Sequence, residues 1–187
     1  NMDRILDYKV SLCEDGMTVL HFLRAKGFSR HILTSMKPDK KALTLNGGKA
    51  GGNTVLHTGD VLHVRILETG SCEGIVPTEM DLSVLYEDED IFVLNKASNL
   101  PVHPSIGNYE NTLANGIESY FRSRNLICPF RCINRLDRDT SGALILAKNA
   151  LSAAILSAQM RNREIRRTYL AIVQGIAPKK GTEIGRA

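Results

Sequence analysis

An acidic stretch near the middle of the chain most constrains the fold, because it divides the sequence into two parts. It covers about residues 69–82 and contains two glycines, Pro77 and several acids, a composition typical of a connection rather than of a helix or strand. A chain of 187 residues is long enough for two domains with separate cores. We therefore expect a first domain at 1–72, a linker at 73–82 and a second domain at 83–187.

The first part predicts two short helices followed by a small sheet. Apolar residues recur at helical spacing on either side of Gly27, a residue type that favours the end of a helix. Ser29 can cap the second helix and Pro38 can end it. Strand-like runs follow at 42–45, 55–56 and 61–67, with turn-forming residues between them.

The second part mixes strand-like and helical patterns, so the predicted fold class is α+β. Strands are expected at 83–86, 91–95 and 143–147, and helices from Asn111 to about 121 and over 150–161. A last strand is expected at Thr168–Gln174, where Tyr169, Ala171 and Val173 would share one face.

The distribution of charge is more informative than the net charge of +4. Residues 24–49 contain seven Lys or Arg against one acid, whereas residues 73–90 contain seven acids and no base. A further basic cluster comprises Arg161, Arg163, Arg166 and Arg167. Basic patches attract polyanions by releasing counterions, but a lone cluster is more often a solvated face. Charge alone therefore leaves nucleic-acid binding open.

Several functional classes lack their sequence features. No apolar run approaches the length of a membrane span, and no basic-then-apolar signal opens the chain. The four cysteines form no CxxC pair, and the five histidines have no metal-ligand spacing. A P-loop and a GxGxxG fingerprint are also absent. We expect a cytoplasmic protein with reduced thiols and no membrane association, and the sequence shows no metal-ligand pattern.

The stretch Asn134–Gly142 carries the most chemistry. Asp137 and Asp139 alternate with Arg135 and Arg138 just before an apolar strand. A neighbouring guanidinium lowers the pKa of a carboxyl group and keeps it ionised, and an ionised, partly desolvated carboxylate can act as nucleophile or base. On charge pattern alone, an ordinary surface loop with local ion pairs remains the alternative.

This stretch is similar to the H-R-L-D-x-x-T-S-G signature of RluA-type pseudouridine synthases, with Asn134 in place of the histidine. The segments 86–96 and 102–105 resemble the opening strands and loop of that family. Residues 167–175 resemble its tyrosine-bearing strand. The N-terminal part resembles the alpha-L RNA-binding motif, which a small-subunit ribosomal protein also contains.

The resemblance implies a small helix-pair-plus-sheet RNA-binding domain followed by a mainly antiparallel β-sheet pseudouridine synthase domain. The implied reaction detaches uracil from ribose, turns it and rejoins it through carbon five, without a cofactor. Asp137 would be the catalytic carboxylate, Arg135 would fill the space left by the flipped base, and Tyr169 would stack on that base. Contacts to RNA phosphates are implied for Arg24, Lys26, Arg30, Lys37, Lys40, Lys41 and Arg138. The RNA would be large-subunit ribosomal RNA or else transfer RNA, with no obligate protein partner.

Two departures from the family pattern matter. Asn134 replaces the signature histidine, although asparagine also offers a donor and an acceptor. The family's later R-x-H-Q-x-R element, whose arginine pairs with the catalytic aspartate, is absent, so we expect a missing C-terminal portion and a fragment that is weak or inactive alone. One alternative is a catalytically silent RNA-binding protein on the same fold. Another is a metal-dependent nuclease that uses Asp137 and Asp139, although flanking arginines make a poor Mg²⁺ site.

Overall fold

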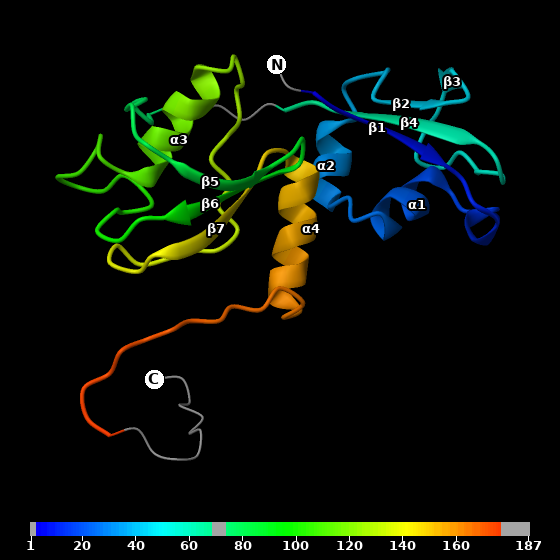
Figure 1. Ribbon diagram of the computed structural model, residues 1–187. Helices are drawn as coiled ribbons and strands as arrows, with labels where there is room; N and C mark the ends of the chain where they lie inside the picture. Colours follow the sequence, from blue (N-terminus) through cyan, green and yellow to red (C-terminus); the bar gives the residue numbers. More distant parts are fainter. Residues whose placement is uncertain (1–2, 69–73, 177–187) are drawn as a thin grey trace.

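The computed structural model describes residues 3–68 and 74–176 and has an α+β fold with two antiparallel sheets (Figure 1). The predicted fold class is therefore confirmed. The predicted boundary between the first domain and the linker, at residues 72 and 73, lies outside the described residues.

The first sheet has the strand order β1-β4-β2-β3. Its strands are β1 (Arg4–Lys9), β2 (Leu43–Leu45), β3 (Gly48–Lys49) and β4 (Val61–Ile66). Between β1 and β2 the chain forms a short 3-10 helix (Leu12–Glu14) and the helices α1 (Val19–Ala25) and α2 (Arg30–Ser35). The Ser29 hydroxyl accepts a hydrogen bond from the Ile32 N–H, and Gly27 separates the two helices with a φ of +94°. Both roles were predicted.

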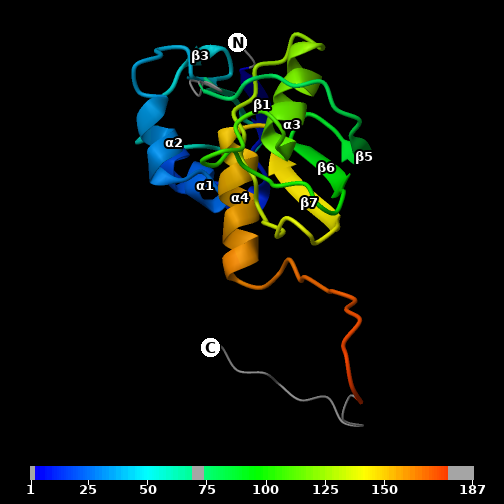
Figure 2. The ribbon, with the colours of Figure 1, turned by 90° about the vertical axis from the view of Figure 1, so that its left-hand side faces the viewer.

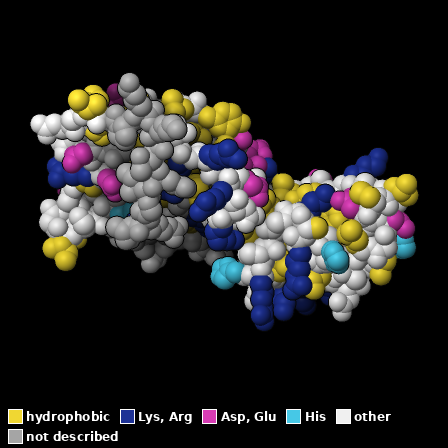
Figure 3. All heavy atoms as spheres, turned by 90° about the horizontal axis from the view of Figure 1, so that it is seen from below, with side chains coloured by type: hydrophobic (Ala, Val, Ile, Leu, Met, Phe, Trp, Pro, Cys, Tyr) yellow, Lys and Arg dark blue, Asp and Glu magenta, His cyan; other side chains and the backbone are white. Residues whose placement is uncertain are grey.

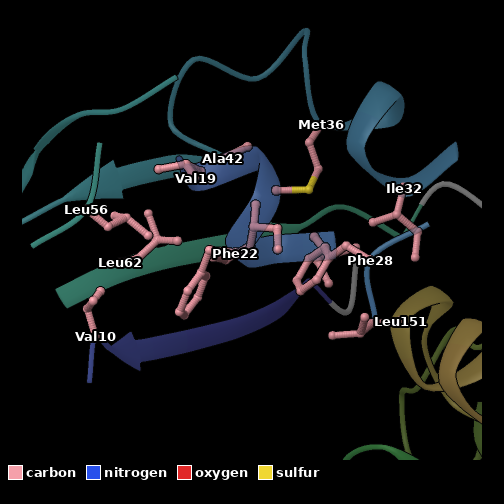
Figure 4. Close-up of a cluster of buried hydrophobic side chains, with 13 residues drawn as sticks. Val10, Val19, Phe22, Phe28, Ile32, Met36, Ala42, Leu56, Leu62 and Leu151 are labelled. Atoms are coloured by element: carbon pink, nitrogen blue, oxygen red, sulfur yellow. The ribbon is translucent and has the colours of Figure 1, made fainter. Parts of the chain in front are cut away.

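The helices α1 and α2 pack on this sheet around a continuous apolar core (Figure 4). Phe22 and Ile32 from the helices meet Leu62 from β4, and all three are almost fully buried. Leu151, which lies far along the chain, joins the same cluster. The N-terminal core is therefore completed by a side chain from the second half of the sequence.

The second sheet has the order β5-β6-β7 and is covered by one helix. Its strands are β5 (Ser83–Glu87), β6 (Ile91–Lys96) and β7 (Gly142–Ala147), and the helix is α3 (Leu113–Arg122). Phe92 of β6 and Leu144 of β7 are fully buried against Ile117 and Phe121 of α3. Thr112 rather than the predicted Asn111 is the N-cap of α3, because its side chain and Asn115 form a reciprocal capping box.

Helix α4 (Ala150–Arg161) joins the two parts of the molecule, and both ribbon views show it beside them (Figures 1 and 2). The carboxylate of Glu68 accepts from the Ala150 N–H at 2.6 Å and pairs with the Arg131 guanidinium at 2.5 Å. A second ion pair joins Arg4 of β1 to Asp90 at 2.8 Å. The N-terminal part is thus bonded directly to the second sheet and to the start of α4.

One predicted strand is wrong. The segment Thr168–Gln174 forms no strand, and the side chains of Leu170 and Ile172 are fully exposed. A strand requires backbone hydrogen bonds from a neighbour, and no strand in residues 3–68 or 74–176 pairs with this segment. Its alternating polarity is therefore not sufficient to form a strand here.

Two smaller differences concern the first sheet. Val55 forms only an isolated bridge with Thr18 instead of part of a strand. The strand β1 was not predicted, and it pairs with β4 along all six of its residues. Neither difference changes the fold class.

The expected linker contacts α3 over its described part. The Asn115 amide donates to the Val76 carbonyl at 2.8 Å, and the Thr78 N–H donates to the Asn115 carbonyl at 3.1 Å. None of the helices in the described parts of the chain is long and apolar enough to cross a membrane.

Candidate active site

The loop that carries Asp137 is fixed at its base by a buried side chain, Asn134. The Asn134 Oδ1 accepts from the Ile145 N–H at 2.8 Å, and its Nδ2 donates to the Ala143 carbonyl at 3.0 Å. Both partners lie on β7, so the amide side chain substitutes for a neighbouring strand at this point. Asparagine thus supplies a donor and an acceptor where the family signature has histidine.

Leu136 anchors the loop from the inside and Gly142 ends it. The Leu136 side chain is buried in the core of the second sheet. Gly142 has a φ of +129°, which side chains rarely tolerate. These features leave Arg135 and Asp137 exposed on the outer side of the loop.

A buried lysine supports the same loop from the opposite side. The Lys96 ammonium group donates to the carbonyls of Ala97, Leu100 and Arg138, each at 2.9 Å. Burial lowers the pKa of Lys96, and the carboxylates of Asp139 and Asp137 oppose that shift. The lysine therefore holds the loop backbone and places a positive charge near both carboxylates. The sequence identified Lys96 only as part of the family resemblance.

The loop also contacts its surroundings through exposed polar groups. The Arg138 guanidinium donates to Asn99 Oδ1 at 2.9 Å, and the Ser98 hydroxyl donates to the Asp139 carbonyl at 2.8 Å. Burial and the charge of Arg135 lower the pKa of His103, which packs edge-on against Phe130. The structure therefore brings Arg135 near His103, a residue to which we assigned no catalytic role.

Tyr169 lies beside this loop, although the strand predicted to carry it is absent. With Asn134, Leu136 and Ile145 it lines a hollow of about 180 Å³. The Tyr169 side chain is 57% exposed, so its ring is available to a ligand. Of the three residues predicted to act in catalysis, only Tyr169 lines this hollow, while Arg135 and Asp137 lie on the loop whose residues Leu136 and Ser141 line it.

A second, larger groove lies on the N-terminal part, between α1, α2 and the β2–β3 hairpin. Its volume is about 550 Å³, and its basic lining residues are Arg24, Arg30, Lys37, Lys40 and Lys49. Of the other residues predicted to contact RNA, Lys26 instead pairs with Glu14 at 2.8 Å and lies over the Phe22 ring. Lys41 is exposed, outside the residues that line the groove. Figure 3, a view from below Figure 1, shows several Lys and Arg side chains along one edge of the N-terminal part.

The described residues contain no group of three or more His, Cys, Asp or Glu side chains that could hold a metal ion. The sequence neighbours of Asp137 and Asp139 include two arginines, Arg135 and Arg138, and no further acidic residue. This arrangement suits a carboxylate that works with guanidinium groups better than a site for a hard cation.

Comparison with known proteins adds a family to this geometry. A family model described as RNA pseudouridylate synthase matches residues 90–185. An uncharacterized RNA pseudouridine synthase of Bacillus subtilis, YjbO, is 34% identical over 167 residues, which are 89% of this chain and 59% of that protein. The ribosomal large subunit pseudouridine synthase D of Xanthomonas campestris is 36% identical over 158 residues, which are 83% of this chain and 46% of that protein.

The chain spans about half the length of the curated relatives that it matches. Among solved structures, human RNA Pseudouridylate Synthase Domain Containing 1 is 29% identical to this chain. The match covers 52% of this chain and 31% of that one, with a TM-score of 0.35.

Proposed function

This chain belongs to the RNA pseudouridylate synthase family, and from that premise we propose that the whole protein converts specific uridines in structured RNA to pseudouridine. The observation that carries the proposal is the geometry around Asp137. An exposed carboxylate lies on a loop fixed by the buried side chains of Asn134 and Lys96, and other residues of that loop line a hollow together with Tyr169. A carboxylate on a fixed loop that borders a hollow suits attack on a base that has left its stack.

Each proposed role has a physical basis. Asp137 acts on the target uridine as nucleophile or electrostatic partner. Arg135, which is exposed two residues before it, occupies the space that the flipped base leaves, because its planar guanidinium can stack on bases and bind phosphate. The exposed ring of Tyr169 stacks on the flipped uracil and serves in proton transfer.

The proposed substrate is large-subunit ribosomal RNA, with transfer RNA as the other candidate. Support for ribosomal RNA comes from the relatives named ribosomal large subunit pseudouridine synthase D, and this substrate would locate the protein in the cytoplasm. We assign the N-terminal part to an alpha-L RNA-binding domain at 1–72, followed by the linker 73–82 and the synthase domain from 83. The assignment of an RNA-binding domain is supported by the helix pair α1 and α2 and by the basic residues that line the groove.

The proposal is tested by pseudouridine formation in ribosomal RNA with the full-length protein. We expect pseudouridine with the native protein and none with Asp137→Asn, which keeps the shape of the side chain but removes its charge. Asp139→Asn is the matched control, because Asp139 is an exposed carboxylate in the same loop. It should retain activity.

Two results would contradict the proposal. Pseudouridine formation by Asp137→Asn would remove Asp137 from its role. Absence of pseudouridine in ribosomal and transfer RNA with the native protein, together with retained RNA binding, would instead support a catalytically silent RNA-binding protein.

A further inference from the structure

Four arginines gather where α4 ends, outside the site described above. Arg161 is the last residue of the helix, and Arg163, Arg166 and Arg167 follow it. Together with Met160 and Ile165 they line an open hollow of about 710 Å³. Glu164, the acid within this run, accepts a hydrogen bond from the Asn162 amide at 3.0 Å.

The positive charge of this cluster has no acidic partner among the described residues. In the described parts of the chain, no ion pair involves any of the four arginines. Attraction to the helix dipole explains one cation in the last turn, Arg161, but the other three arginines lie beyond the helix. Four guanidinium groups within seven residues repel one another, and an anion placed between them would relieve that repulsion.

The cluster borders the candidate active site. Arg166 and Arg167, with Met160 and Ile165, also line the hollow that contains Tyr169. A polyanion held by the four arginines would therefore lie next to the loop of Asp137.

Helix α4 also fixes the position of the cluster relative to the N-terminal part. Leu151 is buried in the N-terminal core, and Ile155 lies so close to Gly27 that an added Cβ would be 2.6 Å from its Cγ1. Arg161 follows Ile155 by six residues, or about 9 Å along a helix. The face in Figure 3, seen from the side toward which α4 points, shows Lys and Arg side chains in its centre and again over the N-terminal part.

From these observations we infer that the arginine cluster Arg161, Arg163, Arg166 and Arg167 is a second phosphate-contact surface for the RNA substrate. The planar guanidinium fork matches the geometry of a phosphate group. The N-terminal part packs on the same helix through Leu151 and Ile155, so the RNA is held at two points, one of which borders the candidate active site. The choice of RNA as the polyanion rests on the proposed function.

The test measures RNA binding by the full-length protein as a function of salt. The probe is a large-subunit ribosomal RNA fragment, and the variant is Arg161→Gln with Arg163→Gln, which leaves Arg166 and Arg167 beside Tyr169 intact. The matched control is Arg122→Gln with Arg124→Gln at the end of α3, where the same two charges are removed from a surface next to Glu118 and Tyr120. Unchanged melting temperatures would show that both variants fold.

Each lost phosphate contact lowers the slope of log K against log salt by about 0.7 to 0.9. We expect the cluster variant to lose about 1.5 units of slope and to bind roughly 30-fold more weakly near 0.1 M salt, and we expect the control variant to keep the native slope. Equal slopes and affinities for the cluster variant and the native protein would overturn the inference. The same loss of slope in the control variant would also overturn it, because the effect would then reflect net charge alone.

Pseudouridine formation by the native protein is measured in parallel. If it fails while the slope still falls in the cluster variant alone, the proposed function is wrong and the phosphate surface stands. If pseudouridine forms and the slopes are equal, the proposed function stands and the inference of a phosphate surface is wrong.

Discussion

The role of Asn134 can be tested by removing its side chain. Asn134→Ala deletes the acceptor for the Ile145 N–H and the donor to the Ala143 carbonyl. Both bonds join the loop of Asp137 to β7. The substitution therefore affects stability through the unpaired backbone groups and activity through the position of the carboxylate.

The loss of stability follows from the surroundings of the two backbone groups. Ala143 is exposed, so water can replace the donor to its carbonyl, whereas the Ile145 N–H lies in a half-buried position. A buried donor left without a partner costs about 1–3 kcal/mol, and the loss of the second bond adds less than that. The sum is about 1.5–3.5 kcal/mol, which corresponds to about 3–14 °C in melting temperature for a chain of this size.

The assay pairs thermal unfolding with the rate of pseudouridine formation in full-length protein. We expect a loss of at least about tenfold in kcat/KM, because small displacements of a catalytic group are costly. Asn134→His, which restores the family residue with one donor and one acceptor, should recover most of both losses. Ser123→Ala is the control, because Ser123 is exposed and its hydroxyl donates one hydrogen bond to the Tyr120 carbonyl.

The reasoning fails if Asn134→Ala melts within about 1 °C of the native protein and modifies RNA at the native rate. The loop would then be held by Lys96 and Leu136 without help from Asn134.

Two further predictions concern the docking of the N-terminal part and the cysteines. Gly27→Ala should lower the melting temperature, because the residue has a φ of +94° and its new Cβ would lie 2.6 Å from Ile155 Cγ1. Adding Ile155→Ala should recover the part of that loss that comes from the clash. No recovery would mean that the backbone strain dominates. Burial raises the pKa values of the Cys128 and Cys132 thiols to about 11, so near pH 8 only about one in a thousand of each is the reactive thiolate. Iodoacetamide at that pH should therefore label the exposed Cys13 well before the buried Cys128 or the half-buried Cys132. Unfolding should remove the difference, and early labelling of Cys128 in the folded protein would contradict its burial.

The sequence by itself determined the local elements and the chemistry of the loop. Helix α4 has the predicted bounds, Ser29 caps α2 as predicted, and β7 follows the Asp137 loop, because each depends on residues close together in the chain. The sequence likewise predicted that Asp137 and Arg135 lie close together, since two residues two positions apart in one loop remain neighbours in any fold.

Only the tertiary structure decided which alternating segments became strands. Strand β1 contains the charged residues Arg4, Asp7 and Lys9 among its apolar residues, so its sequence does not show a clear strand pattern. The strand forms because β4 pairs with it along its whole length. Thr168–Gln174 has the clearer alternation but no strand partner in the described residues, and it forms no regular secondary structure. Pairing between strands is a property of two segments, so the pattern of one cannot settle it.

The contacts that connect the two parts were also beyond the sequence. Glu68, Arg131 and Ala150 meet although more than sixty residues separate Glu68 from the other two, and Leu151 completes a core built from the N-terminal part. Lys96 reaches the carbonyl of Arg138, 42 positions away. Local sequence sets backbone preference over a few residues, whereas these bonds exist only once distant segments have packed. Contacts between segments that are distant in the sequence therefore decided how the Asp137 loop is held.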